Sequence, residues 1–443
     1  MELIHVIKEL LEQKKYATVR DILLEMHPAD VAQMFEDMDK REISLLFRLM
    51  PKEQAAETFV ELEADNQEAL IKAFSDNELK EVLDELYLDD AVDIVEEMPA
   101  NVVRRILQNT DEATRKMINE ILKYPKDSAG SIMTIEYVNL KENMTVADAF
   151  QTIRRTGIDK ETIYSCYVTD QNRYLKGIVS AKGLLLSESD ALISEIMNDD
   201  VISVLTTDDR EEAAQKLQMY DLLAMPVVDL ENRLVGIITI DDAIDVIEQE
   251  ATEDIEMMAA ITPSDKPYLK TGVFETWWKR IPWLLLLMIS ATFTSVIINR
   301  YDTALATLGL AAFMPMLMGT GGNAGSQASV AVIRALSLGE VEMGDIFRIV
   351  WKELRVSVLC GVTMAVATFG KLLLIDRPTT MTAVVVSLTL VATIVTAKLV
   401  GCVLPVLAKR VGFDPAVMAS PFITTIVDAL SLIIYFDIAT AIL

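Results

Sequence analysis

The chain has 443 residues and a formal net charge of −27, with two histidines and three cysteines that form no Cys-x-x-Cys pair. The negative charge is confined to residues 1–270, which carry a net charge of −29, whereas residues 271–443 carry +2. Such a field repels nucleic acids and anionic lipid headgroups and attracts cations, and the scarcity of His and Cys argues against zinc clusters, other transition-metal sites and a disulfide framework.

Residues 1–126 are expected to be helical nearly throughout. The charged, amphipathic start of the chain is not typical of a signal peptide. Apolar residues recur at helical spacing, and a turn followed by an amphipathic helix is repeated near Met26, Met50 and Leu88. Short helical units in series predict an all-α superhelical domain.

Residues 127–250 contain an internal repeat. Residues 167–180 align with residues 226–239, and in both copies two β-rich runs flank a polar turn that contains Asp and Asn. Such a pattern predicts a β-hairpin in each copy. The two β-α-β-β-α units, at 127–190 and 191–250, resemble tandem cystathionine-β-synthase-like (CBS) domains with an α/β fold, which pack as a regulatory module.

The second unit contains a candidate nucleotide site. CBS domains often bind adenine nucleotides through a Gly-x-x-Ser/Thr-x-x-Asp pattern, and Gly236, Thr239 and Asp242 fit it. The first copy has Gly183 where the Asp should be. One site for ATP and an empty structural module therefore both remain open.

Residues 241–270 are predicted to form an acidic connecting helix. Asp241 and Asp245, like Glu250 and Asp254, are like-charged pairs four residues apart, and each pair destabilises a helix by about 0.2–0.5 kcal/mol. A divalent cation would relieve this repulsion, since hard cations such as Mg²⁺ prefer carboxylate and water ligands. A solvated acidic helix is the alternative.

Residues 271–443 are predicted to form a transmembrane domain with five helices. A span needs about twenty apolar residues, and the candidate stretches are 281–299, 303–333, 356–375, 378–408 and 416–443. Lys and Arg are concentrated before the first stretch, between the second and third, and between the fourth and fifth. This distribution predicts a cytosolic N-terminus and a C-terminus outside the cell.

The second span is unusually polar. Residues 319–327 contain four glycines together with Asn323 and Gln327. Irregular or closely packed backbone at membrane depth is tolerated where it is buried in protein or lines a water-filled cavity, which makes Asn323 and Gly325 candidate pore-lining residues. A seam of small residues for helix packing is the other interpretation, and the two are compatible.

The last span contains Asp428. A carboxylate inside a span costs at least about 2.5 kcal/mol and usually faces a pore or a partner. Thr424 and Thr425 lie four and three residues before it, and Pro421 continues the same helical face. This polar stripe predicts a pore lining, and an Asp bonded to another span is the alternative. Asp437 lies nearer the chain end and is expected at the interface.

A helical domain, a CBS pair, an acidic connecting helix and five spans, in this order, resemble the MgtE family of Mg²⁺ channels and transporters. The most specific parts of the resemblance are the glycine–Asn–Gln stretch and the Pro-x-x-Thr-Thr-x-x-Asp segment that ends at Asp428. The resemblance implies a homodimer in the cell membrane, with the pore on the two-fold axis and Asp428 of each subunit holding a hydrated Mg²⁺.

The resemblance also implies cytosolic Mg²⁺ sites. By motif position they carry over to Asp89, Asp93, Asp209, Glu211, Asp221, Asp245, Glu250, Glu253, Asp254 and Asp414. The expected function is magnesium uptake that closes when cytosolic Mg²⁺ bridges these carboxylates. A transporter of Co²⁺, Mn²⁺ or Ni²⁺, regulated by nucleotide at the CBS pair, is the alternative. A membrane enzyme is not favoured, because no nucleophile–base pair is evident.

Overall fold

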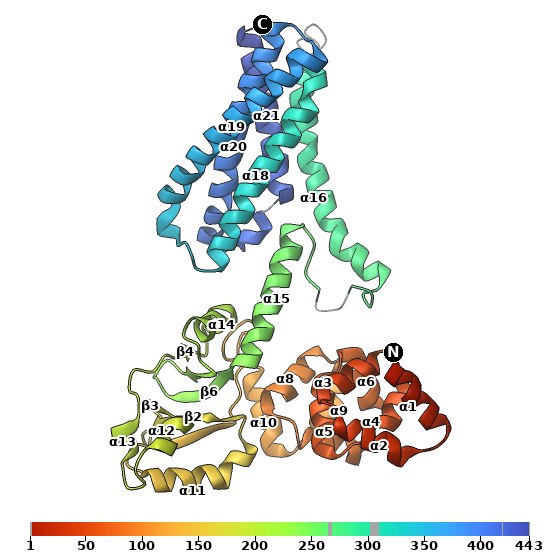
Figure 1. Ribbon diagram of the computed structural model, residues 1–443, viewed down its shortest axis with the longest axis vertical. Coiled ribbons are helices and arrows are strands. Elements are labelled where there is room, and N and C mark those ends of the chain that lie inside the picture. Colours follow the sequence, from red (N-terminus) through yellow and green to blue (C-terminus); the bar gives the residue numbers. More distant parts are fainter. Residues whose placement is uncertain (1, 265–267, 302–309, 419, 443) are drawn as a thin grey trace. The chain divides into compact units, whose positions relative to one another are not determined.

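The computed structural model describes residues 2–264, 268–301, 310–418 and 420–442 (Figure 1). It divides into two compact units, Met1–Ile247 and Glu248–Leu443.

The first part of the first unit is a stack of short helices. Their bounds are α1 Glu2–Glu12, α2 Tyr16–Glu25, α3 Pro28–Glu36, α4 Lys40–Phe47, α5 Lys52–Val60, α6 Ala64–Ala73, α7 Asp76–Leu83, α8 Leu88–Glu97, α9 Ala100–Asn109 and α10 Glu112–Ile121. Helix α3 packs against α5, α5 against α7 and α7 against α9. Because each helix packs on the next but one, one apolar core runs through the stack, which confirms the superhelical prediction.

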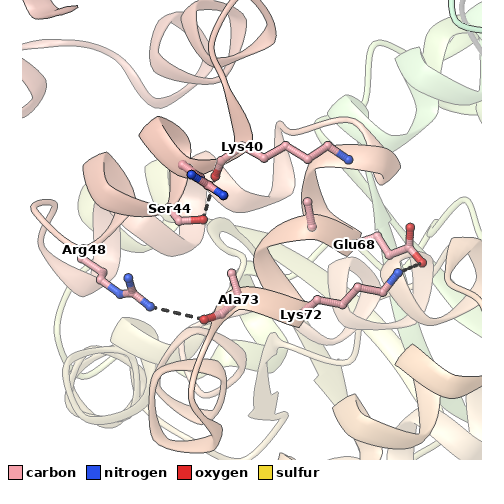
Figure 2. A pocket seen from close by; sticks show the side chains of 8 residues that line it. Lys40, Ser44, Arg48, Glu68, Lys72 and Ala73 are labelled. Atoms are coloured by element: carbon pink, nitrogen blue, oxygen red, sulfur yellow. Dashed lines mark hydrogen bonds and ion pairs between the residues drawn. The ribbon is translucent and has the colours of Figure 1, made fainter.

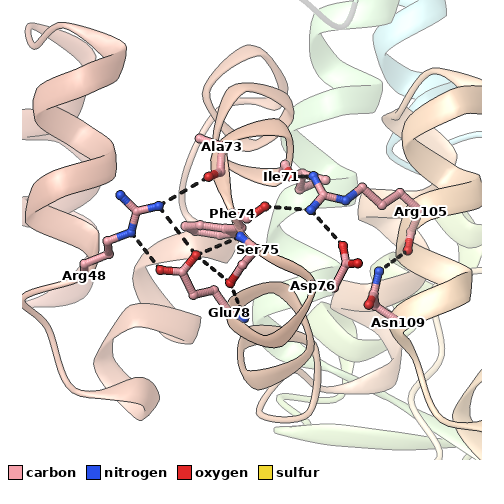
Figure 3. Close-up of polar contacts among 9 residues, drawn as sticks. All are labelled: Arg48, Ile71, Ala73, Phe74, Ser75, Asp76, Glu78, Arg105 and Asn109. Carbon is pink, nitrogen blue, oxygen red and sulfur yellow. Dashed lines mark hydrogen bonds and ion pairs between the residues drawn. The ribbon is translucent and has the colours of Figure 1, made fainter.

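Two arginines hold the end of α6 in this stack (Figure 3). Arg48 donates to the carbonyl oxygen of Ala73 at 3.3 Å and to Glu78 at 2.7 Å. From the other side, Arg105 donates to the carbonyl oxygens of Ile71 and Phe74, the latter at 2.6 Å. These carbonyls lie at or just past the C-terminus of α6, where helical partners are missing, so the two side chains act as its cap.

The rest of the first unit contains two three-stranded sheets with the same topology. They consist of β1 Tyr137–Lys141, β2 Thr162–Thr169 and β3 Leu175–Ser180, and of β4 Val204–Leu205, β5 Ala224–Val228 and β6 Leu234–Thr239, with helices α11 Val146–Thr156, α12 Ala181–Leu186, α13 Ile193–Ile196 and α14 Arg210–Met219. In each sheet the first strand is parallel to the second, and the second and third form a hairpin. The predicted repeat and its two hairpins are therefore confirmed.

The two hairpins are joined through equivalent residues. Leu175 N donates to Asn232 O at 3.1 Å, and Leu234 N donates to Arg173 O at 2.9 Å. Arg173 and Asn232 both have left-handed backbone, with φ of 69° and 62°. The two copies thus pair in a two-fold manner at the turn that the sequence repeat aligns.

The acidic helix is shorter than expected. Helix α15 covers Ile240–Met258 and not the whole of residues 241–270. Ala260 has a φ of 54°, which ends the helical path, and Pro263 follows in a segment without regular secondary structure.

The second unit is dominated by long apolar helices. They are α16 Val273–Arg300, α18 Met314–Ser337, α19 Ile346–Lys371, α20 Thr380–Val411 and α21 Ser420–Ile442, with short turns η2 Leu310–Phe313, η3 Met343–Asp345, η4 Leu372–Asp376 and η5 Pro415–Met418. Helices α18, α20 and α21 share one core, and α19 packs against α20.

Four helical segments of the described residues are long and apolar enough to cross a membrane: Val273–Arg300, Met343–Asp376, Thr380–Val411 and Pro415–Ile442. The second expected span, 303–333, includes residues 303–309, which lie outside the described residues. The described part of that span consists of η2 and most of α18, whose Gly, Asn and Gln residues lower its mean hydropathy. Four of the five predicted spans therefore correspond to candidate membrane-spanning segments among the described residues.

Candidate functional site

The first candidate site is the carboxylate of Asp428 on α21. Its side chain is half-buried, and the Oδ1 atom has no hydrogen-bond partner among the described residues. One turn before it, Thr425 donates to the carbonyl oxygen of Pro421 at 2.9 Å and so satisfies its own hydroxyl. The alternative of an Asp bonded to another span is thus not what the described residues show. A buried carboxylate oxygen without a donor is suited to a water-bound cation.

A seam of glycines brings α18 against the helix that carries Asp428. A Cβ atom on Gly322 would lie 2.6 Å from Thr424 Cγ2, and one on Gly325 would lie 2.7 Å from Ile423 Cγ2. On the α20 side, a Cβ on Gly321 would lie 2.7 Å from Thr393 Cγ2. These approaches leave no room for a side chain. The stretch 319–327 is helical and forms the small-residue seam, and irregular backbone there is ruled out.

The two candidate pore-lining residues of α18 lie on different faces. Gly325 is buried in the seam, whereas Asn323 is exposed in the single chain, as is Gln327 one turn further on. Gly325 therefore acts as a spacer between helices, and the exposed amide face is the part of α18 that a pore or a second subunit could use.

The second candidate site lies where the helical stack meets the CBS pair. Asp89 at the start of α8 is 8% exposed, and burial together with the charge of Asp242 raises its pKa well above the usual value. Burial, followed by the charges of Asp242 and Asp241, raises the pKa of Asp90 to about 7. Burial is the first cause that raises the pKa of Asp93 as well, followed by the charges of Asp242 and Asp90, although its side chain keeps access to solvent.

Two further carboxyls face this group from the CBS side. Burial and the charges of Asp241 and Asp242 raise the pKa of Glu161 to about 7, and its Oε2 atom has no hydrogen-bond partner among the described residues. Desolvation is also the main cause that raises the pKa of Asp242 to about 6. Glu161 and Asp90 were not among the site residues predicted from the sequence, and Asp242 was predicted to belong to a nucleotide site. We call Asp89, Asp90, Asp93, Glu161 and Asp242 the interdomain carboxylate cluster.

Two residues of the predicted nucleotide-binding pattern are hydrogen-bonded to each other. Thr239 is buried, and its hydroxyl donates to Asp242 Oδ2 at 2.5 Å. A ribose or phosphate would have to replace this bond. Asp242 thus belongs to both the nucleotide pattern and the interdomain carboxylate cluster, which couples the two candidate sites.

Of three other predicted metal ligands, Asp221 lies far from Asp209 and Glu211 within one chain. Asp209 caps the start of α14 by accepting from Glu211 N at 2.8 Å. Asp221 lies beyond the other end of this ten-residue helix, with a φ of 51°. A helix of that length separates its ends by about 15 Å, so Asp221 cannot share an ion with Asp209 or Glu211 within one chain.

The third candidate site lies at the end of α15 in the second unit. Asp254 Oδ2 accepts from the hydroxyl of Ser337, the last residue of α18, at 3.0 Å. Burial first, and then the charges of Asp414 and Glu250, raise the pKa of Asp254. Asp414 caps η5 by accepting from Ala416 N at 2.7 Å. We call Glu250, Asp254 and Asp414 the membrane-side carboxylate cluster; Glu253 adjoins it in sequence, and Asp245 is exposed on an earlier turn of α15.

In the part of the chain that the structure describes, no three His, Cys, Asp or Glu side chains are arranged closely enough to hold a metal ion directly.

A hollow of about 480 Å³ lies in the helical stack between α4 and α6 (Figure 2). Ser44, Ala69 and Ala73 are among the residues that line it, together with Lys40 and Arg41. It contains none of the residues predicted from the sequence, and it is separate from the carboxylate clusters.

A helical domain, a CBS pair and a bundle of apolar helices around an intramembrane carboxylate together define a membrane transporter of divalent cations. Residues 314–438 match the family model MgtE, described as a divalent cation transporter; residues 26–127 match the MgtE intracellular N domain, and residues 129–189 and 193–249 match the CBS domain. This description names a transporter and not an enzyme.

Relatives match over the whole chain. The magnesium transporter MgtE of Thermus thermophilus is 36% identical, over 99% of this chain and 98% of that protein, and that of Bacillus subtilis is 32% identical, over 99% and 97%. A crystal structure of the cytosolic domain of the Mg²⁺ channel MgtE in complex with ATP has a TM-score of 0.53 at 36% identity and covers 55% of this chain and 99% of that one. The chain belongs to the MgtE family.

Proposed function

We propose that this chain carries Mg²⁺ into the cell across the plasma membrane, with its N-terminus in the cytosol and its C-terminus outside. The observation that carries the proposal is the Oδ1 atom of Asp428, which is buried and has no described hydrogen-bond donor. The full-length relatives named magnesium transporter support the choice of ion.

The chemistry of the site favours a hydrated ion. Mg²⁺ gives up its waters reluctantly, so a pathway for it should present carboxylates and hydroxyls to the bound water. Asp428 supplies one charge per chain, and two copies across a two-fold axis would balance one dication. We therefore propose a homodimer in which Pro421, Thr424 and Thr425 line the pathway and Asn323 faces it from α18.

We further propose that cytosolic Mg²⁺ closes the pathway through the two carboxylate clusters. At low Mg²⁺, repulsion within each cluster favours separation of the parts that carry it. At high Mg²⁺, hydrated ions bridge the carboxylates and hold these parts together. The sites add their differential affinities, so each ion needs to prefer the closed form only moderately.

ATP is a second candidate regulator. The relative crystallised with ATP supports binding at the CBS pair, and Thr239 and Asp242 are the residues that fit. Because Asp242 also belongs to the interdomain carboxylate cluster, bound ATP should change the affinity of that cluster for Mg²⁺. Titration of ATP into the full chain, with Thr239→Ala as the variant, tests this: unchanged ATP affinity in the variant would remove Thr239 from the site.

The experiment that tests the function is ion flux into liposomes that contain the purified chain. Mg²⁺ influx is expected, and Mn²⁺, Co²⁺ and Ni²⁺ are added singly as competitors and as substrates. Carboxylate and hydroxyl ligands without Cys or His favour Mg²⁺, although Mn²⁺ shares these preferences. Flux of Co²⁺ or Ni²⁺ without flux of Mg²⁺ would support the alternative transporter instead.

A further inference from the structure

A buried ion pair joins two other helices of the membrane unit. Glu353 lies on α19 and Lys398 on α20, with 3.8 Å between Lys398 Nζ and Glu353 Oε2. The two side chains are 13% and 8% exposed. Neither residue belongs to the carboxylate clusters or to the proposed pathway.

Stability does not explain this pair. The distance is longer than a hydrogen bond, and Glu353 Oε2 has no hydrogen-bond partner among the described residues. Burying two charges is costly, and apolar side chains of similar volume usually stabilise the fold as well or better. Ionisable residues at such positions in membrane proteins generally serve function.

The contacts around the pair show what it can specify. Helices α19 and α20 run antiparallel: Glu353 lies 18 residues before the end of α19 at Lys371, and Lys398 lies 18 residues after the start of α20 at Thr380. Further along, a Cβ atom on Gly361 would lie 3.3 Å from Val391 Cα. One turn to the other side, Ile349 and Cys402 belong to one apolar cluster.

The close approach at Gly361 favours the observed register, because a side chain there would crowd Val391, whereas apolar contacts such as those of Ile349 and Cys402 discriminate less against a slide of one turn, about 5.4 Å. A charge pair does not tolerate such a slide, because each charge would then be buried alone. A buried polar pair of this kind is the known means of selecting one register between helices.

The register of α20 matters for the proposed pathway. On its other side, α20 meets the glycine seam: a Cβ on Gly325 would lie 3.2 Å from the carbonyl oxygen of Ala397, and one on Gly401 would touch Gly325 itself. Ala397 adjoins Lys398 in the chain. A shift of α20 would therefore displace α18, and with it the contact between Gly322 and Thr424 on the helix of Asp428.

We propose that Glu353 and Lys398 are positioning residues that fix the register of α19 against α20 and so keep the seam between α18 and α21 in its conducting arrangement. The part of this inference that concerns conduction rests on the proposed Mg²⁺ transport. The part that concerns register stands without it.

The test compares the full chain with two double variants. Glu353→Leu/Lys398→Met removes both charges and keeps the volume, so it folds even where a single variant with one unpaired charge does not. Glu353→Lys/Lys398→Glu reverses the pair. Register is read by disulfide cross-linking of Ile349→Cys to the native Cys402, with Cys166→Ser and Cys360→Ser in every chain. Glu342→Gln, which removes a carboxylate just before η3, is the control.

In the apolar double variant we expect a melting temperature at or above that of the parent, at least a twofold lower cross-linking yield and at least a tenfold lower Mg²⁺ flux. The reversed pair should return both readouts to within twofold of the parent. Parent-level cross-linking in the folded apolar variant would overturn the assignment of register to the pair. Reduced cross-linking with parent-level flux would overturn its role in conduction. A parent that carries no Mg²⁺ would refute the proposed function and leave the cross-linking result to decide the register.

Discussion

Asp254 near the end of α15 accepts a hydrogen bond of 3.0 Å from Ser337, the last residue of α18. The end of the acidic helix is thereby tied to the helix whose glycines pack against the helix of Asp428. Met257 and Met258 add apolar contacts to Ile333 and Ala416. Any change in the charge state of Asp254 therefore acts directly on α18.

Replacing Ser337 with Ala should weaken this tie. A hydrogen bond to a charged group contributes about 1.5–3 kcal/mol, so the cytosolic Mg²⁺ concentration that half-closes the pathway should rise about tenfold or more. Mg²⁺ flux into liposomes, measured against internal Mg²⁺, reports the shift. Thr252→Ala, an exposed position on α15, should leave it unchanged, and an unshifted curve for Ser337→Ala would contradict the role of this contact.

The interdomain carboxylate cluster predicts a pH dependence. Burial first, and then neighbouring carboxylates, raise the pKa of Asp90 and Glu161 to about 7 and that of Asp242 to about 6. Carboxyls whose pKa is higher in the docked form bind protons more tightly there. Docking of the helical domain on the CBS pair is thus strongest below about pH 4, where free carboxyls are also protonated, and weakens as the pH rises through 6 to 7.

Energy transfer between fluorophores on the two domains, in chelator, measures this docking. It should fall between pH 5.5 and pH 8, and saturating Mg²⁺ should abolish the fall. Asp90→Asn/Glu161→Gln should flatten the profile, whereas Asp84→Asn, an exposed carboxyl before α8, should not. A flat profile for the unmodified chain in chelator would refute the prediction.

Arg105 should matter for stability and not for transport chemistry. Its side chain donates to the carbonyl oxygens of Ile71 and Phe74 at the end of α6 and to Asp76 at 3.0 Å (Figure 3). Arg105→Ala leaves these acceptors without a donor and should lower the free energy of unfolding of the helical domain by about 2 kcal/mol. Chemical denaturation followed by circular dichroism checks this, with exposed Arg104→Ala as the control that should change it by less than about 0.5 kcal/mol.

The glycine seam can be tested by a compensating pair. In Gly322→Ala the new methyl group would lie 2.6 Å from Thr424 Cγ2, so Mg²⁺ flux should fall at least tenfold. Thr424→Ser removes that Cγ2 atom, and Gly322→Ala/Thr424→Ser should recover most of the flux. Gly319→Ala adds a methyl group where nothing lies within 4 Å and should conduct normally. Failure of the double variant to recover would show that the clash is not the cause.

Much of this architecture could be predicted from local pattern. The repeat that aligns residues 167–180 with 226–239 predicted two hairpins, because turn chemistry is local, and the turns at Arg173 and Asn232 share the same left-handed backbone. The polar stripe before Asp428 was also visible, because helical periodicity places it on one face.

Other features depend on tertiary contacts that spacing does not encode. Asp90 and Glu161 lie on different domains, so nothing in the sequence showed that they face one charge group. The seam could not be distinguished from irregular backbone, because the deciding contacts of Gly322 and Gly325 are made by Thr424 and Ile423, about a hundred residues away. The predicted helix 241–270 was too long because it included Pro263, which cannot continue a helix, whereas α15 ends at Met258.

In the proposed pathway, Asp428 receives the transported ion. The most direct measurement is Mg²⁺ flux through liposomes with Asp428→Asn, which keeps shape and removes the charge, beside Asp437→Asn on the same helix. Asp437 is exposed and already accepts from Tyr301 Oη at 3.3 Å. We expect at least a tenfold loss of flux for Asp428→Asn and less than a twofold loss for Asp437→Asn. Wild-type flux through folded Asp428→Asn would contradict it.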